Sequence, residues 1–204
     1  MSATAVTLRA HALATFDDAV AYAKIGAAPT QDEAELLRRF INSATQRVEN
    51  YTGRTFLTRT NDEHHDGNGG ARLFLHQMPV LAVATFEQLN LDGTVNQTYT
   101  SADYLLDTVH GALSFKNGGR FYKGVRRWHA VFTASYASLA TVPDDVTLAC
   151  LILVAGYWRD FDQKRDDIEQ QNIAGQSVVI KRGPLPATVK GLLKAHRGPL
   201  AGSM

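Results

Sequence analysis

The segment DEHHDGNGG, residues 62–70, contains residue types that often bind metal ions. His64, His65 and Asp66 follow one another there, and imidazole and carboxylate groups are common ligands of zinc and related ions. Adjacent histidines on a regular helix or strand do not face one ion, and no second group of ligands occurs at a useful spacing. We therefore interpret the segment as a solvated loop before a strand and predict no metal site.

No other residues form a recognisable catalytic motif. The glycines of residues 67–70 lack the Gly-Lys-Ser/Thr ending of a phosphate-binding loop. Cys150 is the single cysteine and lies in an apolar run, which predicts a small core residue rather than a nucleophile. The pairs Asp144–Asp145 and Asp166–Asp167 are typical of a helix start and a solvated segment. We therefore expect no catalytic residue, no cofactor and no enzymatic activity.

Basic residues are concentrated in one part of the chain. No acidic residue occurs between Thr108 and Pro143. Five residues of this interval form what we call the basic cluster: Lys116, Arg120, Lys123, Arg126 and Arg127. Two interpretations remain open, a contact surface for nucleic acid phosphates or an acidic protein, and a solvated hairpin end. Tyr122 and Trp128 flank the cluster, but stacking platforms need more regular aromatic spacing.

A long apolar segment follows, in which residues 148–158 carry no charge. Pro143 with Asp144 and Asp145 after it is typical of a helix start, so we predict a helix from about Pro143 to Phe161. At 3.6 residues per turn, one apolar face contains Val146, Ala149, Cys150, Leu153, Val154 and Tyr157. The opposite side, which we call the second apolar face, contains Leu148, Leu151, Ile152, Ala155 and Trp158.

A surface helix needs only one apolar stripe, so the second apolar face requires an explanation. Leaving three of its large aliphatic side chains in water would forfeit about 5–9 kcal/mol, which is comparable to the net stability of a domain. Either this helix is the central element of its own fold, or its second face contacts a neighbouring copy. The other predicted helices are few and short, which favours the contact between copies.

Three further helices are predicted from capping and periodicity. Thr15 caps a short helix through residues 16–25 that ends at Gly26. Thr30 and Glu33 have the spacing of a capping box, and an amphipathic helix then extends to Gly53. The segment 185–198 closes the chain as a short helix. The polar segment 162–179 is interpreted as a loop, an arm or an edge hairpin.

The middle of the chain has the pattern of short β-strands. Residues 71–76, 80–89 and 111–115 are apolar or alternating, and turn residues separate them. The segment 128–136 alternates with period two, which places five residues on one face: Trp128, Ala130, Phe132, Ala134 and Tyr136. The predicted fold class is α+β, a small helical bundle with an inserted antiparallel β module. The predicted domains are 1–54 with 138–204 for the helical part and 55–137 for the module.

Composition excludes several classes of protein. The chain of 204 residues is 45% hydrophobic with a net charge of +1, which is typical of a globular domain and not of a polyanion-binding arm. Eleven uncharged residues, 148–158, fall short of the about 20 that span a bilayer. The N-terminal residues lack the pattern of a secretion signal. We expect a protein without a membrane partner that stays in the cell that makes it.

The order of these motifs resembles that of the head–tail connector proteins of tailed bacteriophages, also called head-completion or adaptor proteins, which have relatives in gene transfer agents. The segments that carry the resemblance are ALATFDDAVAYAKI, EAELLRRFINSATQRVENYTGRTF, VPDDVTLACLILVAGYW and LPATVKGLLKAHR, with the β-rich middle between the second and third. The most telling are residues 41–56, especially YTGRTF, and the start of the third helix at VPDDV.

The resemblance implies a non-enzymatic virion protein at the head–tail interface, made in the host cytoplasm. Family members form a ring, usually dodecameric, below the portal protein. The ring extends the channel for double-stranded DNA, without sequence specificity, and provides the platform for a tail or stopper protein. The resemblance also implies that the C-terminal segment docks on the portal or a neighbouring subunit, through Leu185, Val189, Leu192, Leu193 and Arg197.

A ring would account for the second apolar face, because each subunit of a cyclic assembly has two different neighbours. The five residues of that face are therefore our predicted subunit interface. An alternative from another functional class remains, a nucleic-acid-binding module that uses the basic cluster for phosphate contacts.

Overall fold

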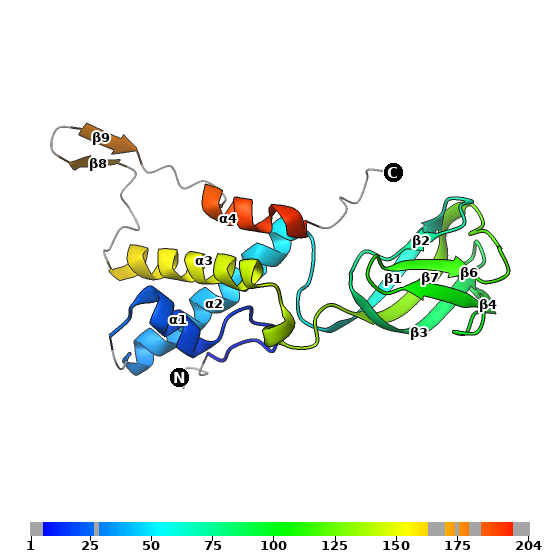
Figure 1. Cartoon of the computed structure of the whole chain (residues 1–204), viewed down its shortest axis with the longest axis horizontal. Helices are drawn as coiled ribbons and strands as arrows, with labels where there is room; N and C mark the ends of the chain where they lie inside the picture. The colour runs from blue at the N-terminus through cyan, green and yellow to red at the C-terminus, as the bar shows by residue number, and fades with distance from the viewer. Residues whose placement is uncertain (1–5, 27–28, 163–169, 174–175, 180–184, 198–204) are drawn as a thin grey trace. The chain divides into compact units, whose positions relative to one another are not determined.

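The computed structural model describes residues 6–26, 29–162, 170–173, 176–179 and 185–197 (Figure 1). The chain forms two compact units. The helical unit contains the described residues up to Thr52 and those of Val142–Arg197, and the β unit contains Gly53–Thr141. The structure combines α-helices with antiparallel sheets, so the predicted α+β class is confirmed.

Local sequence signals explain the first helix, α1 (Phe16–Ala23). The hydroxyl oxygen of Thr15 accepts a hydrogen bond from the backbone N–H of Asp18 at 3.1 Å, as an N-terminal cap should. The helix ends earlier than the predicted stop at Gly26, because Lys24 takes the left-handed conformation with φ of 53°. The backbone N–H of Lys24 donates hydrogen bonds to the backbone oxygens of Val20 and Ala21 in the last turn.

The second helix, α2 (Gln31–Thr52), has the predicted capping box. The backbone N–H of Thr30 donates to the Glu33 carboxylate at 2.8 Å, and the N–H of Glu33 donates back to the Thr30 hydroxyl at 3.4 Å. Gly53 stops the helix as predicted, with φ of 67°. Glycine adopts this conformation without the strain a side chain would add.

The long helix α3 (Asp144–Asp162) packs against α1, α2 and α4 (Ala187–Leu193) and is the central element of the helical unit. Two short 3₁₀ helices, Leu139–Thr141 and Lys194–His196, precede α3 and follow α4. Within the predicted loop, arm or hairpin, β8 (Gln170–Ile173) and β9 (Gln176–Val179) pair antiparallel. Residues 163–169 and 174–175 of that segment lie outside the described residues.

The β unit consists of two antiparallel sheets. One has the strand order β1-β7-β3-β4, with β1 (Arg59–Gly67), β7 (Gly124–Ala134), β3 (Val80–Leu89) and β4 (Val95–Thr98). The other has the order β2-β6-β5, with β2 (Leu73–Phe74), β6 (Ala112–Phe115) and β5 (Tyr104–Asp107). Because β7 pairs with both β1 and β3, it is an interior strand of the larger sheet.

The core of the β unit lies between the sheets and is largely aromatic. Trp128 and Phe132 on β7 are fully buried, as is Phe121 before it, and Phe86 on β3 is 1% exposed. The rings of Phe86 and Trp128 stack with their centres 5.6 Å apart. The alternation predicted for 128–136 is confirmed through Ala134. It ends there because Ser135 has φ of 83°, and Tyr136 is only partly buried.

One element was predicted wrongly. Residues 62–67, interpreted above as a solvated loop, belong to strand β1. Pairing with β7 fixes their extended conformation, with His64 opposite His129 and His65 opposite Trp128. The strand ends at Gly67, where an added Cβ would lie 1.5 Å from the backbone oxygen of Tyr122. No apolar alternation marks this strand because it lies at the edge of the sheet and buries only His65.

Within the residues that the structure describes, no helix combines the length and the apolar character that crossing a bilayer requires.

Candidate functional site

The two faces of α3 differ in burial. Five of the six residues predicted for the first face are buried in the helical unit: Val146, Ala149, Cys150, Leu153 and Val154. The sixth, Tyr157, is partly exposed. The second apolar face remains incompletely covered: Leu148 is 37% exposed, and Leu151, Ile152, Ala155 and Trp158 are partly exposed. The helix is therefore central to its unit and still leaves apolar surface in contact with water.

The C-terminal half of the second apolar face opens into a hollow. Ala155 and Trp158 line one side of it, and residues 21–26 at the end of α1 line the other. Its volume is about 940 Å³. Aromatic surface continues beside it, because the Trp158 ring lies 5.7 Å from that of Phe161, which is 44% exposed. This combination of a hollow and exposed aromatic groups favours a protein contact over a small-molecule site.

Cys150 is a core residue, as predicted. Its side chain is completely buried, and its sulfur lies 3.9 Å from the hydroxyl oxygen of Thr45 on α2. Burial raises the pKa of the Cys150 thiol to about 12, an effect that the Thr45 hydroxyl opposes. A thiol that stays protonated in the neutral range is a poor nucleophile, so the residue contributes to packing.

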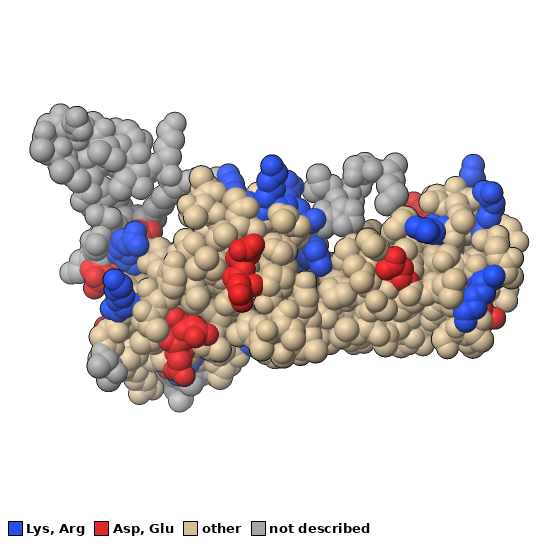
Figure 2. All heavy atoms as spheres, viewed as in Figure 1, with Lys and Arg blue, Asp and Glu red and all other residues tan. Residues whose placement is uncertain are grey.

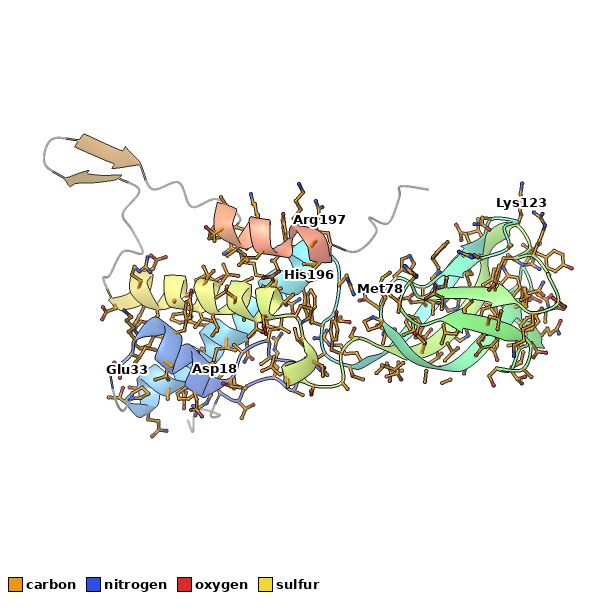
Figure 3. The ribbon with its side chains drawn as sticks, in the orientation of Figure 1. Asp18, Glu33, Met78, Lys123, His196 and Arg197 are labelled. Carbon is orange, nitrogen blue, oxygen red and sulfur yellow. The ribbon has the colours of Figure 1, made fainter. Side chains whose placement is uncertain are left out.

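The predicted C-terminal docking residues fall into two groups. Val189 and Leu193 are completely buried and Leu185 is 7% exposed, so these three belong to the core of the helical unit. Leu192 is partly exposed and Arg197 is exposed. The Arg197 guanidinium lies 5.5 Å from the centre of the Tyr51 ring on α2, and Figure 3 shows Arg197 at the end of the segment after α4. Any docking contact must therefore use the outer side of this segment.

The structure brings together only part of the basic cluster. Arg120, Lys123 and Arg127 line one hollow of the β unit, together with Tyr99 and Tyr122. Lys116 and Arg126 are exposed but do not line it. Figure 3 shows Lys123 projecting outward from the β unit. On the visible face in Figure 2, the basic side chains of the β unit are separated by other residues and do not form one continuous patch.

The aromatic residues beside the basic cluster have different environments. Tyr122 is 65% exposed, whereas Trp128 is completely buried. The Trp128 indole N–H donates to the backbone oxygen of Tyr122 at 3.4 Å. Trp128 is thus part of the core and cannot stack on a base, which leaves Tyr122 as the exposed ring of this pair.

Sequence reasoning also missed two groups of ionisable side chains on β1. Because adjacent residues of a strand face opposite ways, His64 lies with Asp62 and His129, and His65 lies with Glu63 and His76. The prediction that His64 and His65 do not share an ion agrees with this alternation. Their partners His129 and His76 come from β7 and from the segment after β2, which no local pattern in the sequence indicates.

Most of the chain resembles known proteins in sequence pattern and in fold. The sequence pattern of the family described as "Head completion protein" matches residues 12–198. The chain belongs to this head completion protein family. The resemblance to head-completion proteins drawn from the sequence is therefore confirmed at the level of the family. No curated protein sequence matches the chain.

Solved structures of gene transfer agent (GTA) particles contain chains with the same fold. A chain from the neck of an empty GTA particle, computed with C6 symmetry, has a TM-score of 0.62 at 17% identity, covering 97% of this chain and 95% of that one. A chain from the virion of a native GTA particle has a TM-score of 0.61 at 17% identity, covering 95% and 94%. A chain from the neck of a native particle, computed with C12 symmetry, has a TM-score of 0.56 at 18% identity, covering 97% and 95%.

Proposed function

We propose that this head completion protein is a structural, non-enzymatic component of a virion, located at the head–tail neck. Twelve copies form a ring that attaches below the portal protein, extends the channel for double-stranded DNA and supports a tail or stopper protein. The observation that carries the proposal is the match of residues 12–198 to the head completion family. The fold shared with neck proteins of GTA particles, whose necks were computed with sixfold and twelvefold symmetry, supports a ring.

The second apolar face of α3 provides the physical reason for assembly. In the isolated subunit Leu148, Ile152 and their neighbours remain partly in water, and covering them against an adjacent subunit recovers part of the hydrophobic free energy. A cyclic arrangement lets one surface of each subunit meet a different surface of the next. We assign the second apolar face and the hollow beside Trp158 to this contact.

The exposed side of the C-terminal segment is the second proposed contact. Leu192 and Arg197 are accessible there, and α3 holds the segment in place through Val189 and Leu193. We assign these two residues to docking on the portal or an adjacent subunit. The portal could then nucleate the ring, so that the purified protein stays monomeric until it meets the portal.

Particles made without this protein test the function directly. We expect heads that fill with DNA and then lose it or fail to gain tails, because the channel is neither extended nor closed. Electron microscopy of the particles and a measurement of protected DNA provide the readout, with the restored gene as control. Normal infectious particles in its absence would refute the adaptor function.

A second candidate function is nucleic acid binding through the basic cluster. The convergence of Arg120, Lys123 and Arg127 on one hollow favours it. If it is correct, reversing these three charges abolishes a DNA affinity that falls steeply with salt concentration, because phosphate contacts release counterions. Reversing Lys190 and Lys194 in the helical unit is the matched control. An affinity that is absent, or unchanged by the reversal, excludes this function.

A further inference from the structure

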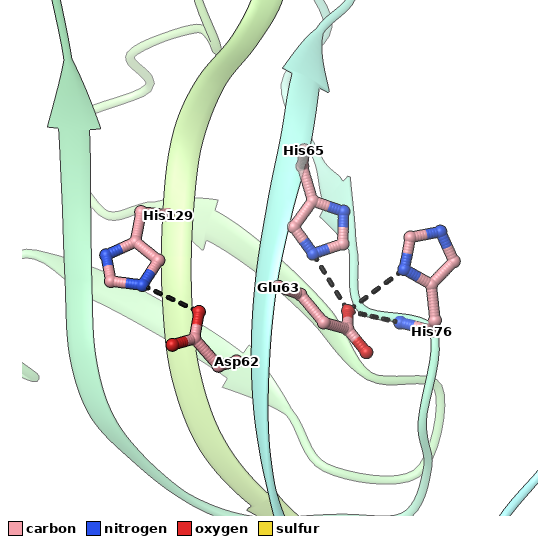
Figure 4. Close-up of polar contacts among 5 residues, drawn as sticks. All are labelled: Asp62, Glu63, His65, His76 and His129. Carbon is pink, nitrogen blue, oxygen red and sulfur yellow. Dashed lines mark hydrogen bonds and ion pairs between the residues drawn. The ribbon is translucent and has the colours of Figure 1, made fainter. Parts of the chain in front are cut away.

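On one side of strand β1, two histidine rings converge on a single carboxylate oxygen of Glu63. In Figure 4 the rings of His65 and His76 both point at the Glu63 carboxylate. The Nε2 atom of His65 lies 2.9 Å from Glu63 Oε2, and the Nδ1 atom of His76 lies 3.0 Å from the same oxygen. The two rings stack at 4.8 Å with an angle of 12° between their planes.

His65 is a buried polar residue whose ring nitrogen lacks a well-aligned hydrogen bond. Its side chain is 5% exposed, yet its Nε2 atom has no hydrogen bond of acceptable geometry, despite its closeness to Glu63. A buried polar atom without a well-aligned partner costs free energy. Such an atom aimed at a carboxylate and a second imidazole is well placed to share a cation with them.

The Glu63 carboxylate is also held from the backbone. The backbone N–H of His76 lies 3.1 Å from Glu63 Oε2 and orients the carboxylate. Hydrogen bonds of this kind commonly position the carboxylate ligands of metal sites.

We propose that Glu63, His65 and His76 bind one divalent transition-metal ion, for which Zn²⁺ is the reference. Two imidazole nitrogens and one carboxylate oxygen form a set that suits Zn²⁺ and related ions, with a water molecule in the remaining position. The three ligand atoms already lie within 4.8 Å of one another. Tetrahedral bonds of about 2.0–2.1 Å require ligand atoms about 3.3 Å apart, so small rotations suffice, and the 51% exposed side chain of His76 has room to turn.

The position of these ligands indicates what the ion does. Glu63 and His65 belong to β1 in the four-stranded sheet, whereas His76 follows β2 of the three-stranded sheet. An ion held by all three links the two sheets at the edge strand. Because the unfolded chain does not hold this geometry, binding stabilises the folded β unit.

The group on the opposite side of β1 is the competing position. It consists of Asp62, His64 and His129. Both ring nitrogens of His129 already have carboxylate partners, Asp62 at 2.9 Å and Glu87 at 3.1 Å. Asp62 is 68% exposed. This group therefore has no counterpart to the buried Nε2 atom of His65, and we assign the ion to the side of Glu63.

Metal titration of the full-length protein after treatment with EDTA tests the site. We expect calorimetry to show about one Zn²⁺ bound per chain, with His76→Ala weakening the affinity at least tenfold. Losing even a supporting residue of a metal site costs about 10–100-fold. His110→Ala is the matched control, because this exposed histidine of the same unit pairs with Asp107 and belongs to neither group. Its affinity should equal that of the original protein.

Further measurements locate the ion. Co²⁺ should give visible absorption bands that His76→Ala and Glu63→Gln both diminish, and Zn²⁺ should raise the unfolding temperature of the original protein but not of His76→Ala. The proposal would be overturned if the unmodified protein bound no Zn²⁺. It would also be overturned if His64→Ala abolished binding while His76→Ala left binding unchanged. The outcome is independent of the virion function, which is tested on particles and not on purified protein.

Discussion

The two units bury their apolar residues to different extents. The β unit encloses an aromatic core between two sheets, with Trp128 and Phe86 at most 1% exposed. The helical unit buries one face of α3 and leaves the second apolar face partly in water, although α3 contacts α1, α2 and α4. The sheet pair closes its core by itself, whereas the helices that the structure describes do not fully cover α3. The helical unit is therefore the part that gains most from a neighbouring subunit.

The largest expected effect concerns the closed core of the β unit. Trp128→Ala should lower the free energy of unfolding of that unit by about 3–5 kcal/mol, because it removes a fully buried ring and leaves a cavity. Denaturant unfolding of the full chain measures it. Tyr122→Ala, which removes an aromatic ring that is 65% exposed, is the control and should have little effect. Equal effects of the two variants would show that the core is not closed as described.

The next prediction separates the two faces of α3 with neighbouring residues. Leu153 is 3% exposed, whereas Ile152 is partly exposed. We expect Leu153→Asp to unfold the helical unit, because a carboxylate cannot be buried there without a partner. Ile152→Asp should leave the subunit folded but prevent ring formation. Circular dichroism reports folding, and electron microscopy of necks reports assembly.

The outcome for Ile152→Asp decides whether the comparison between units holds. Unfolding by this variant would mean that the second apolar face is internal to the subunit. A folded variant that still assembles would mean that the contact between subunits lies elsewhere. Either result would remove the assignment of this face to the ring contact.

Thiol labelling compares the buried face of α3 with its second apolar face and changes the protein less than an introduced charge does. Because burial raises the pKa of Cys150 to about 12, its thiol should resist alkylation at pH 8 until the helical unit unfolds. In a Cys150→Ala background, Leu148→Cys should react rapidly in the free subunit, since Leu148 is 37% exposed. The assembled neck should protect it. Fast labelling of Cys150 in the folded protein would contradict the packing of α3 against α2.

The smallest expected effect concerns the capping box of α2. Hydrogen bonds from Thr30, the backbone N–H first and then the hydroxyl, lower the pKa of Glu33 below its ordinary value of 4.5. A lowered pKa in the folded state contributes stability above pH 4.5 that is lost as the pH falls through the folded value. Thr30→Ala keeps the backbone N–H and removes the hydroxyl, so it should lower the melting temperature slightly at pH 7, and the part of this difference that comes from the hydroxyl bond to Glu33 should disappear in acid. A difference that is constant with pH would mean that the Thr30 hydroxyl does not act through the Glu33 charge.

The candidate surfaces could be predicted from the sequence only in part. The two faces of α3 follow from its periodicity, and the buried face is confirmed. For the predicted docking segment, the sequence could not separate Val189 and Leu193, which α3 helps to bury, from the exposed Arg197. The basic cluster has the same limitation, because only the strand arrangement brings three of its five members to one hollow.

The sequence by itself determined the features that depend on residues within a few positions of one another. These are the caps at Thr15 and Thr30, the stop at Gly53, the two apolar faces of α3 and the alternation of β7. Only the tertiary structure decided that residues 62–67 form a strand and that their histidines meet acids and other histidines. The partners come from 13 positions away for Glu63 and His76, and from 67 for Asp62 and His129. Contacts over such separations depend on strand pairing and sheet packing, which local sequence patterns do not encode.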